Sequence, residues 1–121
     1  MTQFFRGIVV FLAMFGLGAS PIGLAQASYP QKPIRLIVPF PPGGSTDIFS
    51  RMLGEKLTQI WKQPVIIENK AGASGQIAMN ELLKMPTDGH TIFMGHIGTL
   101  AVNAALFKNL SYDPVKDLAP I

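Results

Sequence analysis

Four turn-forming residues, Pro41-Pro42-Gly43-Gly44, separate an apolar stretch from an amphipathic one that begins at Ser45. A strand that ends at such a turn and leads into a helix gathers several backbone N–H groups, because the first helical turn leaves its amides without intrahelical partners. The positive end of the helix dipole lies at the same point, and both favour an anion. We therefore predict an anion-binding loop. Its candidate binding residues are Phe40, Gly43, Gly44, Ser45, Thr46 and Asp47.

The type of anion is narrowed by what the loop lacks. No Gly-Lys-Ser/Thr sequence ends it, and Gly43-Gly44 does not have the G-x-G-x-x-G spacing, so nucleotide phosphates and dinucleotides are not expected. Few fixed positive charges lie nearby in the sequence, which favours a carboxylate over a polyphosphate. An ordinary tight turn, in which glycine supplies a positive φ, is the alternative interpretation.

Asp47 admits two interpretations. Beside a carboxylate ligand its charge would be repulsive unless it faces away or accepts hydrogen bonds from backbone amides or a ligand amine. Aspartate is common in the first turn of a helix, where it complements the dipole. We favour the structural role.

Two further glycine loops carry polar side chains. The second follows Val65-Ile66-Ile67, and its candidate binding residues are Asn69, Gly72, Ala73, Ser74 and Gly75. The third follows Thr91-Ile92-Phe93-Met94, and its candidates are His96 and Thr99. Solvated turns are the alternative for these loops.

The sequence gives no reason to expect a metal, a cofactor or a catalytic residue. Cysteine is absent, and the two histidines lack carboxylates at metal-ligand spacing. Ser45, His96 and Asp47 can be written as a triad, but the G-x-S-x-G turn is missing and Ser45 lies only two residues from Asp47.

Three strand–loop–helix units position these loops. Short apolar runs predict strands at 34–38, 65–67 and 91–94, and the segments between and after them predict helices at 46–62, 76–84 and 100–107. This alternation predicts an α/β fold with a parallel sheet covered on both faces, so the three loops should gather along one edge. For the first helix we expect Ser45 or Thr46 as N-cap. Its expected inward stripe is Phe49, Met52, Leu53, Leu57, Ile60 and Trp61.

Charge and composition exclude one class of partner. The net charge is +3 and the isoelectric point about 9.5, but the basic residues are scattered singly along the chain. No basic run or aromatic-interleaved basic stripe is present, so nucleic acid is not an expected partner.

The first 27 residues have the pattern of a cleavable signal peptide. Arg6 precedes an apolar run from Gly7 to Leu17, and Ala25-Gln26-Ala27 forms an A-x-A cleavage signal. The apolar run is short for a membrane span, although a retained anchor is the alternative. We expect export to the periplasm.

Several motifs occur in one order: Tyr29 to Gly44 with Asp47 and Arg51, Val65 to Ala73, Asp88-Gly89 before a strand, and Leu110 to Pro114 with Asp117. In these motifs the chain resembles the Bug family of periplasmic solute-binding receptors, the extracytoplasmic component of tripartite tricarboxylate transporters. His90 departs mildly from the tyrosine usual after Asp-Gly, and Ser74 replaces a frequent glycine.

The resemblance implies a two-lobed, type II-like periplasmic binding protein that closes on a small organic carboxylate and delivers it to membrane permease subunits. It implies that the loops at 40–47 and 69–75 grip one carboxylate group and that the loop at 96–99 tunes specificity. Members of the family continue well beyond this length. We therefore expect residues 28–121 to be a truncated N-terminal lobe that lacks the second lobe and binds weakly or not at all.

Two other functions stay open at this stage. One is a small secreted enzyme that acts on an anionic substrate, with His96 as general base beside the Gly43-Gly44 loop. The other is a sensor partner that presents its ligand to a membrane receptor.

Overall fold

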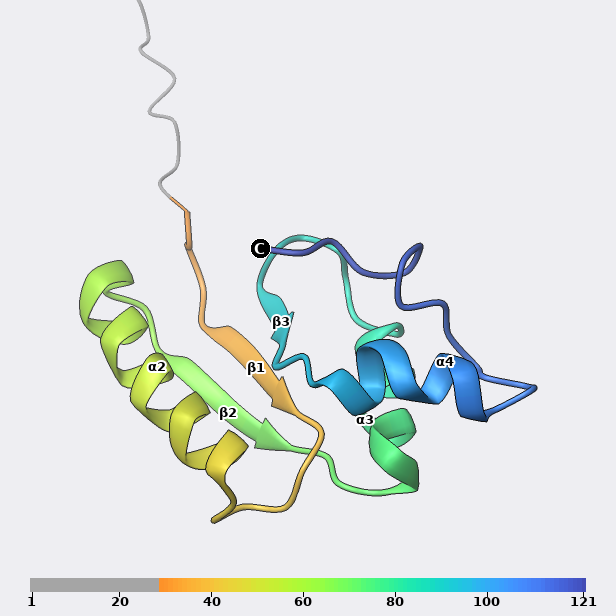
Figure 1. The fold of residues 1–121 in the computed structure, drawn as a ribbon. Coiled ribbons are helices and arrows are strands. Elements are labelled where there is room, and N and C mark those ends of the chain that lie inside the picture. Colours follow the sequence, from red (N-terminus) through yellow and green to blue (C-terminus); the bar gives the residue numbers. More distant parts are fainter. Residues whose placement is uncertain (1–28) are drawn as a thin grey trace, which may run out of the picture.

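The computed structural model describes residues 29–121, so the predicted signal peptide at 1–27 lies outside the described residues. Three strands form one sheet: β1 (Ile34–Val38), β2 (Val65–Asn69) and β3 (Thr91–Phe93). Their order is β2-β1-β3, and both pairs are parallel (Figure 1). The predicted parallel sheet is therefore confirmed, with β1 at the predicted bounds.

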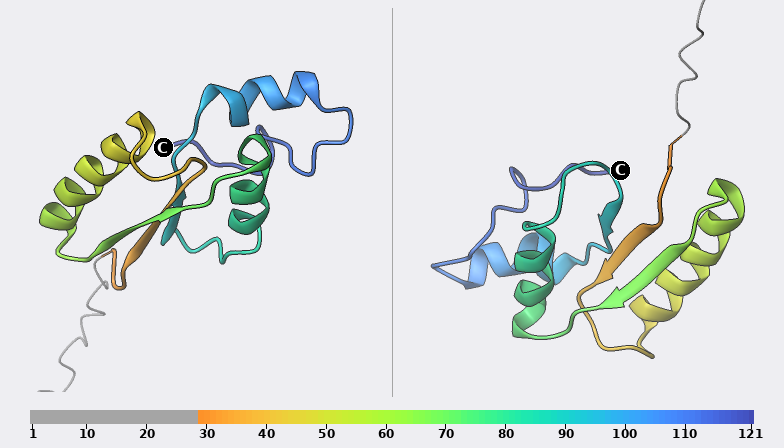
Figure 2. Two further views of the ribbon diagram at one scale, coloured as in Figure 1. Left: turned by 90° about the horizontal axis from the view of Figure 1, so that it is seen from below. Right: turned by 180° about the vertical axis from the view of Figure 1, so that it is seen from behind.

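Helices cover both faces of this sheet. The helix α2 (Ser45–Trp61) lies on one face, and α3 (Gln76–Leu82) lies on the other, preceded by the short turn η1 (Ala73–Gly75) (Figure 2). A π-helical turn, η2 (Gly98–Val102), leads into α4 (Asn103–Leu106). Among the described residues, no helix has the length and apolar character needed to cross a membrane.

The core lies at the central strand. The alternation of a strand places Ile34, Leu36 and Val38 on one face, where they are fully buried under α2. Ile37 points to the other face, which α3 covers with the buried Ala78 and Met79. Burial on both faces explains why every residue of β1 except Arg35 is apolar.

An ion-pair network joins β1, β2 and α3 on the α3 side of the sheet. Arg35 donates from Nε and Nη2 to the two oxygens of Glu68 at 2.6 and 2.7 Å. Lys70 Nζ lies 2.9 Å from Glu81 Oε1, and Arg35 Nη2 lies 3.7 Å from the same oxygen. The bidentate arginine pair holds two neighbouring strands together and raises the pKa of Arg35, chiefly through its hydrogen bonds to Glu68.

The predicted inward stripe of α2 is only partly correct. Leu53, Leu57 and Trp61 are half-buried, but Phe49, Met52 and Ile60 are 60%, 63% and 71% exposed. The fully buried positions are instead Asp47, Ser50 and Gly54. Small side chains let α2 approach β2 closely, and the polar contacts of Asp47 fix the rotation of the helix.

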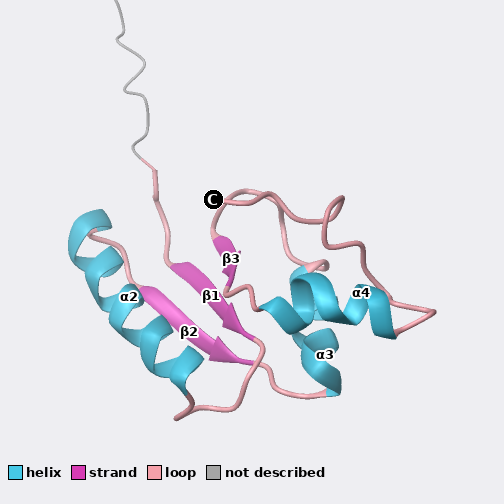
Figure 3. Ribbon diagram, in the orientation of Figure 1, coloured by secondary structure: helices cyan, strands magenta, loops and turns pink. Residues whose placement is uncertain are grey.

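The third helical segment also differs from its prediction. A single helix at 100–107 was expected, but the chain forms the π-helical turn at 98–102 and then four α-helical residues. Beyond Leu106 the chain forms no further helix or strand, as Figure 3 shows in pink. Tyr112 in this segment is nevertheless buried, with 6% of its surface exposed.

Gly54 sets the spacing between α2 and β2, because a Cβ there would lie 3.0 Å from Ile67 Cδ1 and 3.4 Å from Val65 Cγ1. We expect Gly54→Leu to lower the free energy of unfolding by about 1–3 kcal/mol, the usual cost of overpacking. Urea unfolding followed by circular dichroism measures this. Gln59→Leu, at an exposed position of the same helix, is the control. Equal stabilities of the two variants would contradict the close approach.

Candidate functional site

The loops that follow the three strands meet at one edge of the sheet, as their parallel direction requires. The Nδ2 of Asn69, at the end of β2, donates to the carbonyl oxygen of Phe40 in the first loop at 3.1 Å. The ring of Phe40 meets the ring of His96 in the third loop edge-on, with centroids 4.9 Å apart. The predicted gathering of the loops is confirmed.

The N-terminus of α2 is open. Its N-cap residue is Gly44, and no side chain caps it, so the predicted cap by Ser45 or Thr46 is wrong. The backbone of Gly44 is extended (φ −78°, ψ 168°), which places the helix start one residue earlier than the hydroxyl residues. The N–H groups at the start of a helix have no intrahelical acceptor. The amides of Gly44, Ser45 and Thr46 can therefore donate to a ligand.

Asp47 is held by three donors of the protein itself. Its Oδ2 accepts from the Gly43 amide at 2.8 Å and from Arg51 Nε at 3.0 Å, and its Oδ1 accepts from Asn69 Nδ2 at 2.9 Å. Only 3% of Asp47 is exposed. These contacts agree with the structural interpretation of Asp47, and they also engage the amide of Gly43.

The same contacts stabilise the ionised carboxylate. The hydrogen bond from Arg51 contributes most, followed by those from Gly43 and Asn69, and together they lower the pKa of Asp47 from 3.8 to about 2. The pKa of Arg51 is raised in turn, chiefly by its hydrogen bond to Asp47.

The second loop contains four successive residues with positive φ: Gly72 (125°), Ala73 (46°), Ser74 (53°) and Gly75 (85°). The Gly75 amide donates to the Gly72 carbonyl at 2.9 Å and closes the turn. Only glycine fits at 75, because a Cβ there would lie 2.3 Å from Thr99 Cγ2. The left-handed conformation of Ala73 and Ser74 costs about 1–3 kcal/mol each, so other contacts must hold the turn.

In the third loop, His96 and Thr99 have different environments. His96 is exposed, and its Nδ1 accepts from the Gly98 amide at 3.0 Å. Thr99 is 1% exposed, and its hydroxyl donates to the His96 carbonyl at 2.9 Å. Thr99 therefore fixes the loop from inside, whereas the ring of His96 is open to a ligand.

A cavity of about 330 Å³ lies at this edge. It is lined by Phe40, Pro41, Pro42, Gly44, Ser45, Thr46 and His96. The structure thus brings the first and third loops together around one space. The second-loop candidates Asn69, Gly72, Ala73, Ser74 and Gly75 do not line this cavity; Asn69 instead supports it through Phe40 and Asp47.

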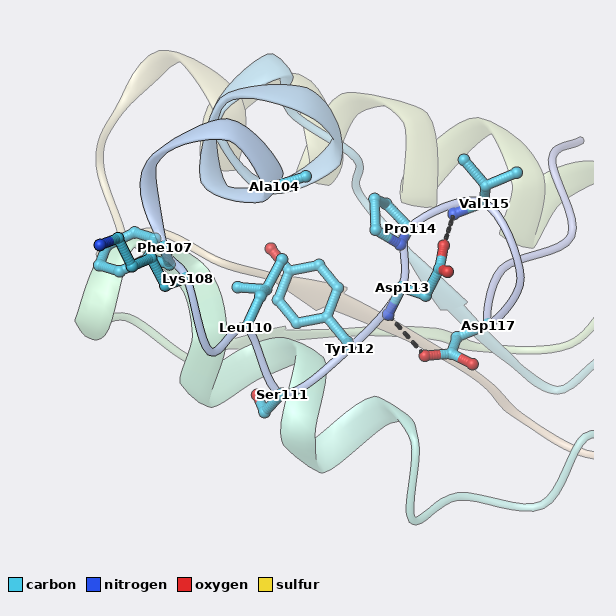
Figure 4. Close-up of a pocket in the computed structure, with 10 residues that line it drawn as sticks. All are labelled: Ala104, Phe107, Lys108, Leu110, Ser111, Tyr112, Asp113, Pro114, Val115 and Asp117. Carbon is cyan, nitrogen blue, oxygen red and sulfur yellow. Dashed lines mark hydrogen bonds between the residues drawn. The ribbon is translucent and has the colours of Figure 1, made fainter.

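A second, larger cavity of about 620 Å³ lies between α4 and the chain that follows it, and none of the candidate loop residues lines it (Figure 4). Its lining includes the carboxylates of Asp113 and Asp117, which do not favour an anion. In Figure 4 these side chains bond to the backbone of their own turn. We therefore place the anion site at the smaller cavity. Among the described residues, no three His, Cys, Asp or Glu side chains are grouped to hold a metal ion.

Sequence reasoning missed two supporting residues, Asn103 and Tyr112. Asn103 Nδ2 donates to the Ser74 carbonyl at 2.9 Å and to the Tyr112 hydroxyl at 3.1 Å. Only the position of Tyr112 in the family-like Leu110 to Pro114 motif drew attention to that segment.

The sequence of the chain is similar to those of known proteins. The model of the tripartite tricarboxylate transporter family receptor matches residues 49–121. Protein BugT of Bordetella pertussis is 38% identical over 122 residues, an alignment that covers 100% of this chain and 36% of BugT. The chain therefore spans about a third of the length of this relative.

Two solved structures have the same fold over the matched part. A periplasmic transporter is 47% identical with a TM-score of 0.70, and the match covers 74% of this chain and 30% of that one. MatC from Rhodopseudomonas palustris, solved with bound malate, is 38% identical with a TM-score of 0.70 over the same shares.

The lowered pKa of Asp47 predicts the pH dependence of stability. A carboxylate whose pKa is lower in the folded state stabilises the fold above its ordinary value, and this contribution is lost as the pH falls from about 4 to about 2. We expect Asp47→Asn to be less stable than the native chain at pH 6, with the difference shrinking toward pH 2. Urea unfolding across this range measures it.

Asp88→Asn is the control, because the pKa of Asp88 is also lowered to about 2, mainly by Lys32, but at an exposed ion pair far from the loops. The amide chemical shifts of the first loop should change in Asp47→Asn only. A stability difference that is the same at pH 6 and pH 2 would contradict the role of the ionised Asp47.

Proposed function

Because the chain belongs to the tripartite tricarboxylate transporter receptor family, we propose that it binds a small organic carboxylate in the periplasm for delivery to membrane permease subunits. The observation that carries the proposal is the uncapped N-terminus of α2 at the edge where the three strand-end loops meet. Malate bound to MatC supports a carboxylate as the ligand class.

In this proposal the signal peptide at 1–27 is removed, and residues 28–121 belong to the N-terminal lobe. One carboxylate group of the ligand enters the cavity of about 330 Å³ and accepts hydrogen bonds from the amides of Gly44, Ser45 and Thr46. We propose that the amides of Ala73 and Ser74, in the second loop at the same edge of the sheet, contact the part of the ligand that extends out of this cavity. Asp47 and Asn69 do not touch the ligand but hold the first loop in place.

The expected affinity follows from the number of donors. Each hydrogen bond from an amide to a carboxylate contributes about 1.5–3 kcal/mol, and association costs several kcal/mol or more. Two or three such bonds leave a dissociation constant on the order of millimolar, about −4 kcal/mol. We propose that one lobe alone binds this weakly, because the contacts that would close over the ligand come from a facing lobe in a two-lobed receptor.

His96 adds a proposed specificity contact. Since Nδ1 accepts from the Gly98 amide, the proton of the neutral ring lies on Nε2, which makes this nitrogen a donor. The ring lines the cavity beside Phe40. We propose that Nε2 donates to a second oxygen of the ligand, such as a hydroxyl or a further carboxylate.

Titration of the chain with malate, followed by amide chemical shifts, tests the carboxylate site. We expect shifts at Ser45 and Thr46 that saturate in the millimolar range. Gly44→Val keeps the backbone amide but places a branched side chain at the cavity that Gly44 lines, so it should hinder the approach of the carboxylate and weaken this response at least about tenfold, as much as the loss of roughly one charge-assisted hydrogen bond. The variant suits the backbone, because φ is negative and the nearest atom to the new Cβ is 3.9 Å away.

Gln59→Val on the same helix is the matched control and should bind like the native chain. Absence of shifts at Ser45 and Thr46 with malate and with a panel of di- and tricarboxylates and aromatic acids would contradict the proposal. A response that Gly44→Val leaves unchanged would do the same.

His96→Phe separates hydrogen bonding from packing at the third loop, because a phenyl ring can keep the edge contact with Phe40 but has no N–H. We expect malate to bind about five- to tenfold more weakly, as for loss of one hydrogen bond. The shifts at Ser45 and Thr46 should persist at saturation. Unchanged affinity in His96→Phe would show that the ring contributes packing alone.

A further inference from the structure

We infer that Tyr112 and Asn103 are positioning residues that hold the second and third loops in their binding conformation, although neither lies at the cavity between the loops. The inference rests on the proposed carboxylate site. It starts from a chain of buried hydrogen bonds: the Tyr112 hydroxyl donates to the Thr99 carbonyl at 2.6 Å, and Asn103 donates both to that hydroxyl and to the Ser74 carbonyl.

This chain uses both N–H groups of the Asn103 side chain and the Tyr112 hydroxyl. The two N–H groups of the Asn103 amide serve two acceptors, and the Tyr112 hydroxyl both accepts and donates once. Asn103 is 2% exposed and Tyr112 6% exposed. Buried, directional hydrogen bonds of this kind fix the arrangement of the segments that they join. Here they join the loop at 72–75, the π-helical turn at 98–102 and the C-terminal segment.

The second loop needs such an anchor. Ala73 and Ser74 have the left-handed conformation that non-glycine residues rarely adopt, and the carbonyl of Ser74 is the acceptor for Asn103. The next residue, Gly75, lies directly against the methyl group of Thr99. The loop is therefore held at Ser74 by Asn103 and at Gly75 by Thr99.

Tyr112 supports both of these contacts, that of Asn103 with Ser74 and that of Thr99 with Gly75. Its hydroxyl bonds to the backbone of Thr99 and to the side chain of Asn103. Figure 4 shows its ring directed from the C-terminal turn toward α4. The turn itself is closed by Asp113 and Asp117, which accept from backbone amides of the same turn. Removal of the Tyr112 hydroxyl should therefore loosen the two loops and leave the sheet intact.

Amide hydrogen exchange in Tyr112→Phe tests this directly. The amides of Gly75 and Asn103 report on the two loops, because both donate within their own turns. The amide of Arg35, which donates to His90 across the sheet, reports on the fold as a whole. We expect exchange at Gly75 and Asn103 to become about tenfold faster, with Arg35 unchanged, as for loss of one buried hydrogen bond.

Tyr29→Phe is the matched control. The Tyr29 hydroxyl also donates to a backbone carbonyl, that of Gly89, but far from the two loops. It should leave exchange at Gly75 and Asn103 unchanged. Equal acceleration at Arg35 in Tyr112→Phe would show a general loss of stability and overturn the positioning role. Unchanged exchange at Gly75 would overturn it as well.

Malate titration of the same variants links the network to binding. In Tyr112→Phe the malate-induced shifts at Ala73 and Ser74 should shrink, while those at Ser45 and Thr46 persist. Equal shifts at Ala73 and Ser74 in the native chain and in Tyr112→Phe would contradict the inference. If the native chain responds neither to malate nor to the panel of other carboxylates, the carboxylate function fails, and the exchange rates still decide the role of Tyr112.

Discussion

The buried carboxylate of Asp47 ties together the three segments that form the first binding loop. A buried charge is unfavourable unless it is hydrogen-bonded, and Asp47 finds its donors in the loop after β1, in α2 and at the end of β2. The carboxylate thereby fixes how α2 is rotated on the sheet. Ser50 and Gly54 turn inward, and Phe49 and Met52 remain exposed. The N-terminus of the helix is open because its N-cap residue is Gly44 and no side chain caps it.

This arrangement also determines the electrostatic character of the site. Arg51 compensates the charge of Asp47, so neither presents a free charge to the cavity. The attraction for an anion then comes from backbone amides and from the end of the helix dipole, which is equivalent to roughly half an elementary charge. Such a weak, fixed field suits a single carboxylate group. A polyphosphate would need the lysine or arginine contacts that this edge lacks among the residues lining the cavity.

Local patterns in the sequence predicted most of the fold. The apolar run at 34–38 gave the bounds of β1, and the turn residues placed the three loops correctly along one edge. The rotation of α2 was predicted incorrectly because hydrophobic periodicity places the large apolar residues inward. It takes no account of small residues, which permit close packing of the helix on the sheet. The contact between Asp47 and Asn69 joins positions 22 apart in sequence, and the bond from Asn103 to Ser74 spans 29. No local pattern encodes such pairs.

The shape of the second loop is therefore not a property of its own residues. Gly72 and Gly75 permit the left-handed turn, but Ala73 and Ser74 between them disfavour it, and only one local hydrogen bond, from Gly75 to Gly72, closes it. The turn persists because Asn103 and Thr99 contact it from another segment, and both depend on a tyrosine that follows α4. Strain in a binding loop and the contacts that sustain it thus lie in different parts of the chain.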